Sequence, residues 1–156
     1  VISIHGALVN VFGIGVIITG DSCAGKTECA RDLAERGHAW IADDVIEIEK
    51  RENILYGHSH GLIKHLIHIK RKGIIDAKKF FIASAVLEET VINLLVELAT
   101  ANNMQRQEGA YQVDKLQDIM GVKLSYVQLP CFPHTENIYK CVEQAVQRLL
   151  IERSIA

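Results

Sequence analysis

A glycine-rich segment near the N-terminus constrains the fold of this chain more than any other feature. It matches the pattern G-x-x-x-x-G-K-[ST] in full and consists of Gly20, Asp21, Ser22, Cys23, Ala24, Gly25, Lys26 and Thr27. An alternating apolar run precedes it, and a helical apolar pattern follows from Lys26 to a stop at Gly37. Strand, loop and helix in this order predict an α/β fold with a phosphate-binding loop at the N-terminus of the helix.

The residue types in and after this loop indicate ATP with Mg²⁺ as the ligand. Lys26 is expected to reach the β- and γ-phosphate oxygens, and the Thr27 hydroxyl is expected to ligate Mg²⁺. Asp43 and Asp44 follow a short apolar segment, 39–42, at what should be the carboxyl end of a strand. One carboxylate can position the metal and the other can accept a proton from an attacking hydroxyl. The alternative is a solvated acidic turn that ends the strand.

Periodicity predicts the other elements of the chain. A hairpin is expected over 2–19, interrupted at 12–15, with its second strand at 16–19. The other expected elements are an extended continuation over 45–48, a mostly helical stripe over 62–69, a strand rather than a helix over 91–98, a strand over 122–129 that ends at Pro130, and a last helix capped by Thr135.

Composition excludes several classes of protein. Lys and Arg number 17 against 19 Asp and Glu in 156 residues, so no basic surplus is present for a nucleic-acid backbone. The longest uncharged stretch, 1–20, contains polar residues and glycines, which argues against a membrane span. It also lacks a secretory leader, and the four cysteines form no C-x-x-C pair, so we expect a reduced, cytoplasmic location. The initial valine suggests a domain of a longer chain.

Five segments carry a resemblance to a known family: Ser3–Val9, Gly20–Glu28, Arg36–His38, Ile41–Ile48 and Gly73–Asp76. Together they resemble the catalytic domain of HPr kinase/phosphorylase. The resemblance is close over 1–48, patchy over 57–77 and weak from about residue 83. It implies one P-loop domain over 1–156, of the type shared with phosphoenolpyruvate carboxykinase, in which a mixed sheet is flanked by helices.

The resemblance also implies an activity and a set of site residues. It implies an ATP-dependent protein serine kinase that acts on the phosphocarrier HPr of the sugar phosphotransferase system and reverses the reaction with inorganic phosphate. His5, Lys26 and Asp44 would then be catalytic, and Thr27 with Asp43 would hold the metal. Family members assemble into hexamers, which implies a homo-oligomer. Without the resemblance, His5 would be interpreted as a structural histidine in a strand.

Some positions depart from the family pattern and leave alternatives open. His68 stands where the family has a magnesium-binding glutamate, and the segment 130–137 lacks the family's arginine and glycine. No convincing match to a later family arginine is found near 111–114. A kinase with another substrate, or an ATP-sensing module without turnover, therefore remains a second hypothesis.

Three further features have both a functional and a structural interpretation. On the expected helix, His65 and His68 would share one face, as metal ligands or as solvated residues. Cys23 in the loop is a candidate for oxidative control of nucleotide binding. The basic residues of 70–72 and 78–79 either steer an acidic partner or form a solvated face.

Overall fold

A computed structural model describes residues 1–21, 25–61, 65–69, 72–81, 85–99, 115–130 and 137–155. The strands are β1 (Ile2–His5), β2 (Ala7–Val11), β3 (Ile14–Gly20), β4 (Ala39–Ala42), β5 (Val45–Arg51), β6 (Ile54–Ser59), β7 (Leu66–Ile69), β8 (Gly73–Asp76), β9 (Glu89–Ala99), β10 (Lys115–Ile119) and β11 (Val122–Pro130). The helices are α1 (Lys26–Glu35), α2 (Ala77–Phe80) and α3 (Ile138–Ile155). Among these described residues, no helix has the length and apolar character needed to cross a membrane.

The described strands form a mixed sheet of nine strands and a separate two-stranded hairpin, β7–β8. The path through the large sheet is β1-β5-β6-β9-β3-β2-β4, and β11 pairs with β9 and with β10. Strand β9 is parallel to both β3 and β11, whereas the other pairs are antiparallel. The carboxyl ends of β3, β9 and β11 therefore lie at one edge of the sheet, where open α/β folds place ligands. The predicted α/β class with a mixed sheet and flanking helices is confirmed.

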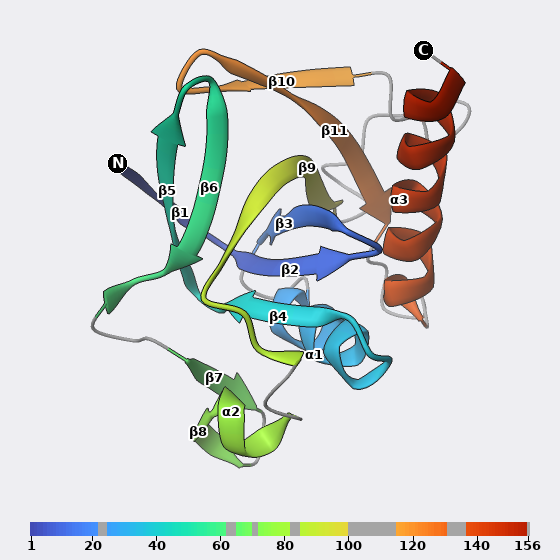
Figure 1. Ribbon diagram of the computed structural model, residues 1–156. Helices are drawn as coiled ribbons and strands as arrows, with labels where there is room; N and C mark the ends of the chain where they lie inside the picture. The colour runs from blue at the N-terminus through green and yellow to red at the C-terminus, as the bar shows by residue number, and fades with distance from the viewer. Residues whose placement is uncertain are drawn as a thin grey trace.

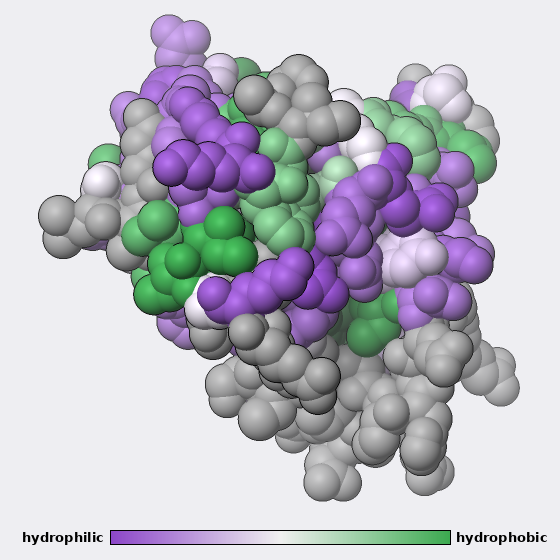
Figure 2. Space-filling view, turned by 90° about the horizontal axis from the view of Figure 1, so that it is seen from below, coloured by the Kyte–Doolittle hydropathy of each residue, from purple (hydrophilic) through white to green (hydrophobic). Residues whose placement is uncertain are grey.

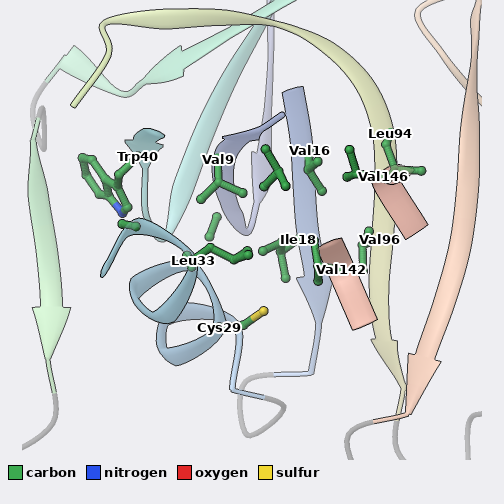
Figure 3. Close-up of a cluster of buried hydrophobic side chains, with 14 of the residues drawn as sticks. Val9, Val16, Ile18, Cys29, Leu33, Trp40, Leu94, Val96, Val142 and Val146 are labelled. Carbon is green, nitrogen blue, oxygen red and sulfur yellow. The ribbon is translucent and has the colours of Figure 1, made fainter. Parts of the chain in front are cut away.

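Helices α1 and α3 cover one face of the sheet, as Figure 1 shows. In the close-up of Figure 3, side chains of α1 and α3 meet alternate residues of the central strands. The labelled members of this buried cluster are Val9, Val16, Ile18, Cys29, Leu33, Trp40, Leu94, Val96, Val142 and Val146. Because side chains alternate along a strand, Ile17 points to the opposite face. This packing holds the beginning of α1 rigidly at the end of β3.

A second core lies on the face away from α1 and α3. It joins Ile17 of β3 and Leu95 of β9 to Ile46 and Ile48 of β5. Strands β5 and β6 form a long antiparallel hairpin beside this core, and β1 pairs with the outer edge of β5. The N-terminal strand is thus held in the sheet by pairing with β5, and not by pairing with β2, which follows it in the sequence.

The hairpin predicted at the N-terminus is present but shorter than expected. Strands β2 and β3 pair in it, and the turn consists of Phe12 and Gly13 alone. Both residues have positive φ angles, 53° and 85°, as the tight turn between two twisted strands requires. Ile14 and Gly15 belong to β3, and residues 2–5 form β1, which lies outside this hairpin.

The helical stripe predicted over 62–69 is wrong where the structure describes it. Residues 66–69 form β7, which pairs antiparallel with β8. Leu66 is partly exposed and Ile67 is fully buried, which is the alternation of a strand rather than of a helix. Gly73, the first residue of β8, has a φ of 81°, and the two short strands satisfy each other's backbone groups.

The other predicted elements are confirmed with small shifts of their ends. Helix α1 begins at Lys26, β4 covers 39–42, β5 continues past residue 48, and the segment 91–98 lies within strand β9. Strand β11 ends at Pro130 as expected. Thr135, the predicted cap of the last helix, lies outside the described residues, and α3 begins at Ile138.

An ionic cluster ties the end of α1 to α3. The Arg36 guanidinium lies 3.1 Å from one carboxylate oxygen of Glu143, and His38 Nε2 lies 2.8 Å from the other. The same guanidinium lies over the Tyr139 ring, and Phe12 packs edge-on against His38. Burial raises the pKa of the Glu143 carboxyl, but the hydrogen bonds from His38 and Arg36 outweigh it, so this pKa lies below its ordinary value.

We expect Glu143→Gln to lower the free energy of unfolding by about 1–3 kcal/mol, because the Arg36 guanidinium and the His38 imidazole lose their carboxylate partner. The carboxyl has a lowered pKa in the folded state, so its stabilisation is present above its ordinary pKa of 4.5 and disappears as the pH falls through the lower value. Urea unfolding of both proteins across this range measures the difference. Glu152→Gln, an exposed change on the same helix, is the control. Equal stability of wild type and Glu143→Gln at neutral pH would contradict the expectation.

Candidate functional site

The phosphate-binding loop connects the end of β3 to the start of α1, as the sequence pattern predicts. Of its members, Ser22, Cys23 and Ala24 lie outside the described residues. Lys26 begins α1, and its ammonium group donates hydrogen bonds to the carbonyl oxygens of Gly20 (2.8 Å) and Asp21 (3.1 Å). The Lys26 side chain is therefore directed toward the first two residues of its own loop. The N–H groups in the first turn of α1 have no carbonyl partner within the helix and are available to an anion.

Thr27 and Asp43 are in direct contact. The Thr27 hydroxyl donates a hydrogen bond of 2.8 Å to Asp43 Oδ1. Asp43 is buried, with 5% of its surface exposed. Strand β4 carries it inward at its carboxyl end, next to the first turn of α1. A hydroxyl and a carboxylate are hard oxygen donors of the kind that Mg²⁺ prefers, so these two residues fit the metal that the loop implies.

Asp44 follows Asp43 but points outward, because the chain turns sharply between β4 and β5. Its φ of 69° is in the left-handed region, and its carbonyl oxygen accepts a hydrogen bond from Gly6 N–H at 3.0 Å. Pairing of β1 with β5 places His5 opposite Val45. His5 Nε2 then lies 3.3 Å from Asp44 Oδ1, and both side chains are about two-thirds exposed. The two adjacent carboxylates therefore occupy different environments, one buried and one open to solvent.

A pocket of about 500 Å³ brings these groups together. Its polar lining comes from His5, Lys26, Thr27, Asp43 and Asp44, and its opposite wall comes from Leu66, Ile67, Gly73 and Ile74 of the β7–β8 hairpin. Leu66 and Ile74 remain 36% and 71% exposed. Figure 2 looks at this lower end of the molecule, where hydrophobic surface lies beside strongly hydrophilic surface. The pocket is thus charged on one side and apolar on the other.

Sequence reasoning missed that the β7–β8 hairpin forms a wall of the site. The alternation of side-chain character over 66–69 and the glycine at 73 are the sequence signals that could have predicted this hairpin. It also missed Glu97, which lines a neighbouring hollow of about 410 Å³ together with His5 and Asp21. Glu97 accepts a hydrogen bond of 2.7 Å from Gln128 Nε2. It lies far along the chain from the loop, and only the parallel pairing of β3 with β9 brings it there.

Two of the weaker sequence hypotheses concern His65 with His68, and Cys23. The shared helical face of His65 and His68 does not exist, because His68 lies in strand β7 and His65 in the turn before it. His65 Nε2 instead lies 3.2 Å from a Glu88 carboxylate oxygen. Within the described part of the chain, no group of three or more His, Cys, Asp or Glu side chains is arranged to hold a metal ion. The hypothesis on Cys23 falls outside the described residues.

Comparison with known proteins assigns the family. Residues 1–155 match the family described as the HPr Serine kinase C-terminal domain. The chain belongs to this family. All five segments that carried the resemblance lie within the matched residues.

Named relatives agree with this assignment. An HPr kinase/phosphorylase of Geobacter sulfurreducens is 35% identical over 150 residues, which is 96% of this chain and 47% of the relative. One of Levilactobacillus brevis is 40% identical over 127 residues, 79% of this chain and 41% of the relative. The solved structure of the Hpr(Ser) kinase/phosphatase from Coxiella burnetii superposes with a TM-score of 0.89 at 26% identity and covers 99% of this chain and 93% of that one. The chain spans about half the length of the curated relatives it matches.

Proposed function

We propose that this chain binds ATP with Mg²⁺ and transfers the γ-phosphoryl group to a serine hydroxyl of an HPr-like phosphocarrier protein. The observation that carries the proposal is the single pocket in which the P-loop lysine, the Thr27–Asp43 pair and the His5–Asp44 pair surround one space. Membership of the HPr serine kinase family supports the same reaction. In this proposal residues 1–156 act as one kinase domain, assemble into a homo-oligomer and work in the cytoplasm.

Lys26 and the first turn of α1 hold the nucleotide phosphates in the proposed reaction. When phosphates enter, the Lys26 ammonium exchanges its contacts with the Gly20 and Asp21 carbonyl oxygens for phosphate oxygens. Thr27 and Asp43 would hold Mg²⁺, which when bound neutralises charge on the β- and γ-phosphates. The buried position of Asp43 keeps its carboxylate aimed at this place rather than at solvent.

Asp44 acts as the general base. The serine oxygen attacks the γ-phosphorus, the bond between that phosphorus and the ADP oxygen breaks, and the serine proton passes to the Asp44 carboxylate. His5 Nε2, 3.3 Å from Asp44 Oδ1, orients this carboxylate. In the reverse direction an oxygen of inorganic phosphate attacks the phosphorus of the phosphoserine, and the bond between that phosphorus and the seryl oxygen breaks. Asp44 returns the proton to the seryl oxygen, and pyrophosphate is the second product.

The apolar wall of the pocket favours a protein acceptor over a small polar one. Leu66 and Ile74 are large, exposed hydrophobic side chains at the mouth of a phosphoryl-transfer site. Exposed apolar surface beside a polar site is typical of protein–protein contact. A serine presented between apolar neighbours would bury this surface as its hydroxyl reaches Asp44.

The test is transfer of label from γ-labelled ATP to purified HPr in the presence of Mg²⁺ or Mn²⁺. We expect label on a serine of HPr, and no label after the divalent metal is removed by chelation, because the phosphates then lack their counter-charge. Intact ATP binding without any labelled acceptor would instead support an ATP-sensing module. Label on another protein or on a metabolite of a cell extract, with HPr unlabelled, would support a kinase with a different substrate.

A further inference from the structure

The apolar wall of the P-loop pocket belongs to a small unit made of β7, β8 and α2. Among the described strands, β7 and β8 pair only with each other, and Figure 1 shows them with α2 below the large sheet. Ile67 and Ala77 are fully buried in the cluster that also contains α1 residues, and the Phe81 ring lies 6.4 Å from the Trp40 ring between centroids. Since no described strand of the large sheet pairs with this unit, side-chain contacts decide where the apolar wall lies.

One carboxylate oxygen receives two donors from this unit. Glu88 lies directly before β9, the central strand of the large sheet. His65, in the turn before β7, has its Nε2 atom 3.2 Å from Glu88 Oε1. The Lys78 ammonium group of α2 donates a hydrogen bond of 3.3 Å to the same oxygen. The beginning of β7 and the helix after β8 are therefore joined at a single atom of Glu88.

His65 is the more shielded of the two donors. Its side chain is 14% exposed, compared with 46% for Lys78, and a polar contact is screened less when water is excluded from it. Within the described residues, the buried Nδ1 atom of His65 has no hydrogen-bond partner. The backbone of His65 is fixed as well, because its carbonyl oxygen accepts a hydrogen bond of 2.7 Å from Ala77 N–H. A shift of His65 would therefore move β7 and the start of α2 together.

The segment that carries Glu88 is bonded to the strand that carries the acidic pair. Leu87 N–H donates a hydrogen bond of 2.9 Å to the Trp40 carbonyl oxygen, and Trp40 forms a parallel bridge with Val86. Trp40 lies in β4, which ends immediately before Asp43. Glu88 thus connects the neighbourhood of the catalytic carboxylates to the opposite, apolar wall of the pocket.

We propose that Glu88 is a positioning residue for the protein acceptor. It is not among the residues that line the pocket, and it acts through His65 and Lys78 by holding Leu66 and Ile74 in place. The inference rests on the proposed function, because it requires an acceptor protein that contacts this wall. Loss of the Glu88 carboxylate lets the hairpin shift and weakens acceptor binding, whereas the contacts within the P-loop region persist.

Glu88→Ala tests the proposal through a separation of kinetic constants. We expect the KM for HPr to rise about threefold to tenfold, with kcat and the affinity for ATP within about twofold of the wild type. Backbone amide exchange in β7, in β8 and at Ala77 should become at least about threefold faster, while exchange in β3 stays unchanged. Glu88→Gln, which keeps an acceptor oxygen at the same length, should lie between Glu88→Ala and the wild type.

Glu89→Ala is the matched control. Glu89 is the next residue along the chain, but its carboxylate lies 3.1 Å from the Arg51 guanidinium of β5, so its loss should leave the KM for HPr and exchange in the hairpin unchanged.

Three results would overturn the proposal: an unchanged KM for HPr in Glu88→Ala, an equal rise in the KM for ATP, or hairpin exchange equal to that of the wild type. Failure of the proposed function is distinguishable, because the wild type would then leave HPr unlabelled. That result would remove the acceptor role, and amide exchange would still decide whether Glu88 holds the hairpin.

Discussion

Lys26→Ala is expected to weaken ATP binding by about 10- to 100-fold and to slow phosphoryl transfer by a further factor of about 10²–10³. The affinity falls because the Lys26 ammonium group is a charged donor that already contacts carbonyl oxygens of the loop that receives the phosphates. The rate falls as well, because charge on the β- and γ-phosphates that develops during transfer loses its cation. Equilibrium binding of ATP and single-turnover transfer to HPr measure the two effects separately.

Lys50→Ala is the matched control for this experiment. Lys50 also donates a hydrogen bond to a backbone carbonyl, that of Met120, but at a turn remote from the site. Its removal tests whether loss of any such lysine contact disturbs the protein. If Lys26→Ala bound ATP as tightly as the wild type, the assignment of the phosphate-binding loop would be wrong.

Asp44→Asn is expected to bind ATP within about twofold of the wild type and to transfer phosphate about 10²–10⁴ times more slowly. Asparagine keeps the size of the side chain and tolerates the φ of 69°, so the turn and the Gly6 hydrogen bond should persist. Only the ability to accept a proton is removed. Rapid-quench single-turnover kinetics at saturating ATP measure the transfer step itself.

The control for Asp44→Asn is Glu52→Gln. Glu52 is an exposed acidic residue in a turn with a φ of 50°, in the β5–β6 hairpin. The neighbouring Asp43→Asn change should act differently: it removes the partner of the Thr27 hydroxyl and should raise the Mg²⁺ concentration needed for transfer. Full transfer activity in Asp44→Asn would show that another group accepts the proton.

Local sequence patterns were sufficient for the elements that carry the P-loop. The alternation before Gly20, the glycine-rich run and the helical pattern from Lys26 all arise from contacts between residues close in the chain. The acidic pair was found for the same reason, because Asp43 and Asp44 directly follow the strand that positions them. The resemblance then directed attention to His5, which local patterns alone would have treated as structural.

Long-range pairing decided what local patterns could not. Short apolar runs such as 66–69 fit a helix or a strand equally well, and the hairpin with β8 made this one a strand. The partner of β1 was also invisible to periodicity, since β5 lies about 40 residues away along the chain. That pairing is what places His5 beside Asp44.

The sequence by itself determined the phosphate-binding loop, the helix behind it and the acidic pair after β4, because each depends on backbone preferences and spacing within a few residues. Only the tertiary structure separated the environments of the two carboxylates. The turn after β4 buries Asp43 against Thr27 and turns Asp44 outward to His5. Side-chain direction at such a turn depends on which strands pack around it, and those strands come from distant parts of the chain.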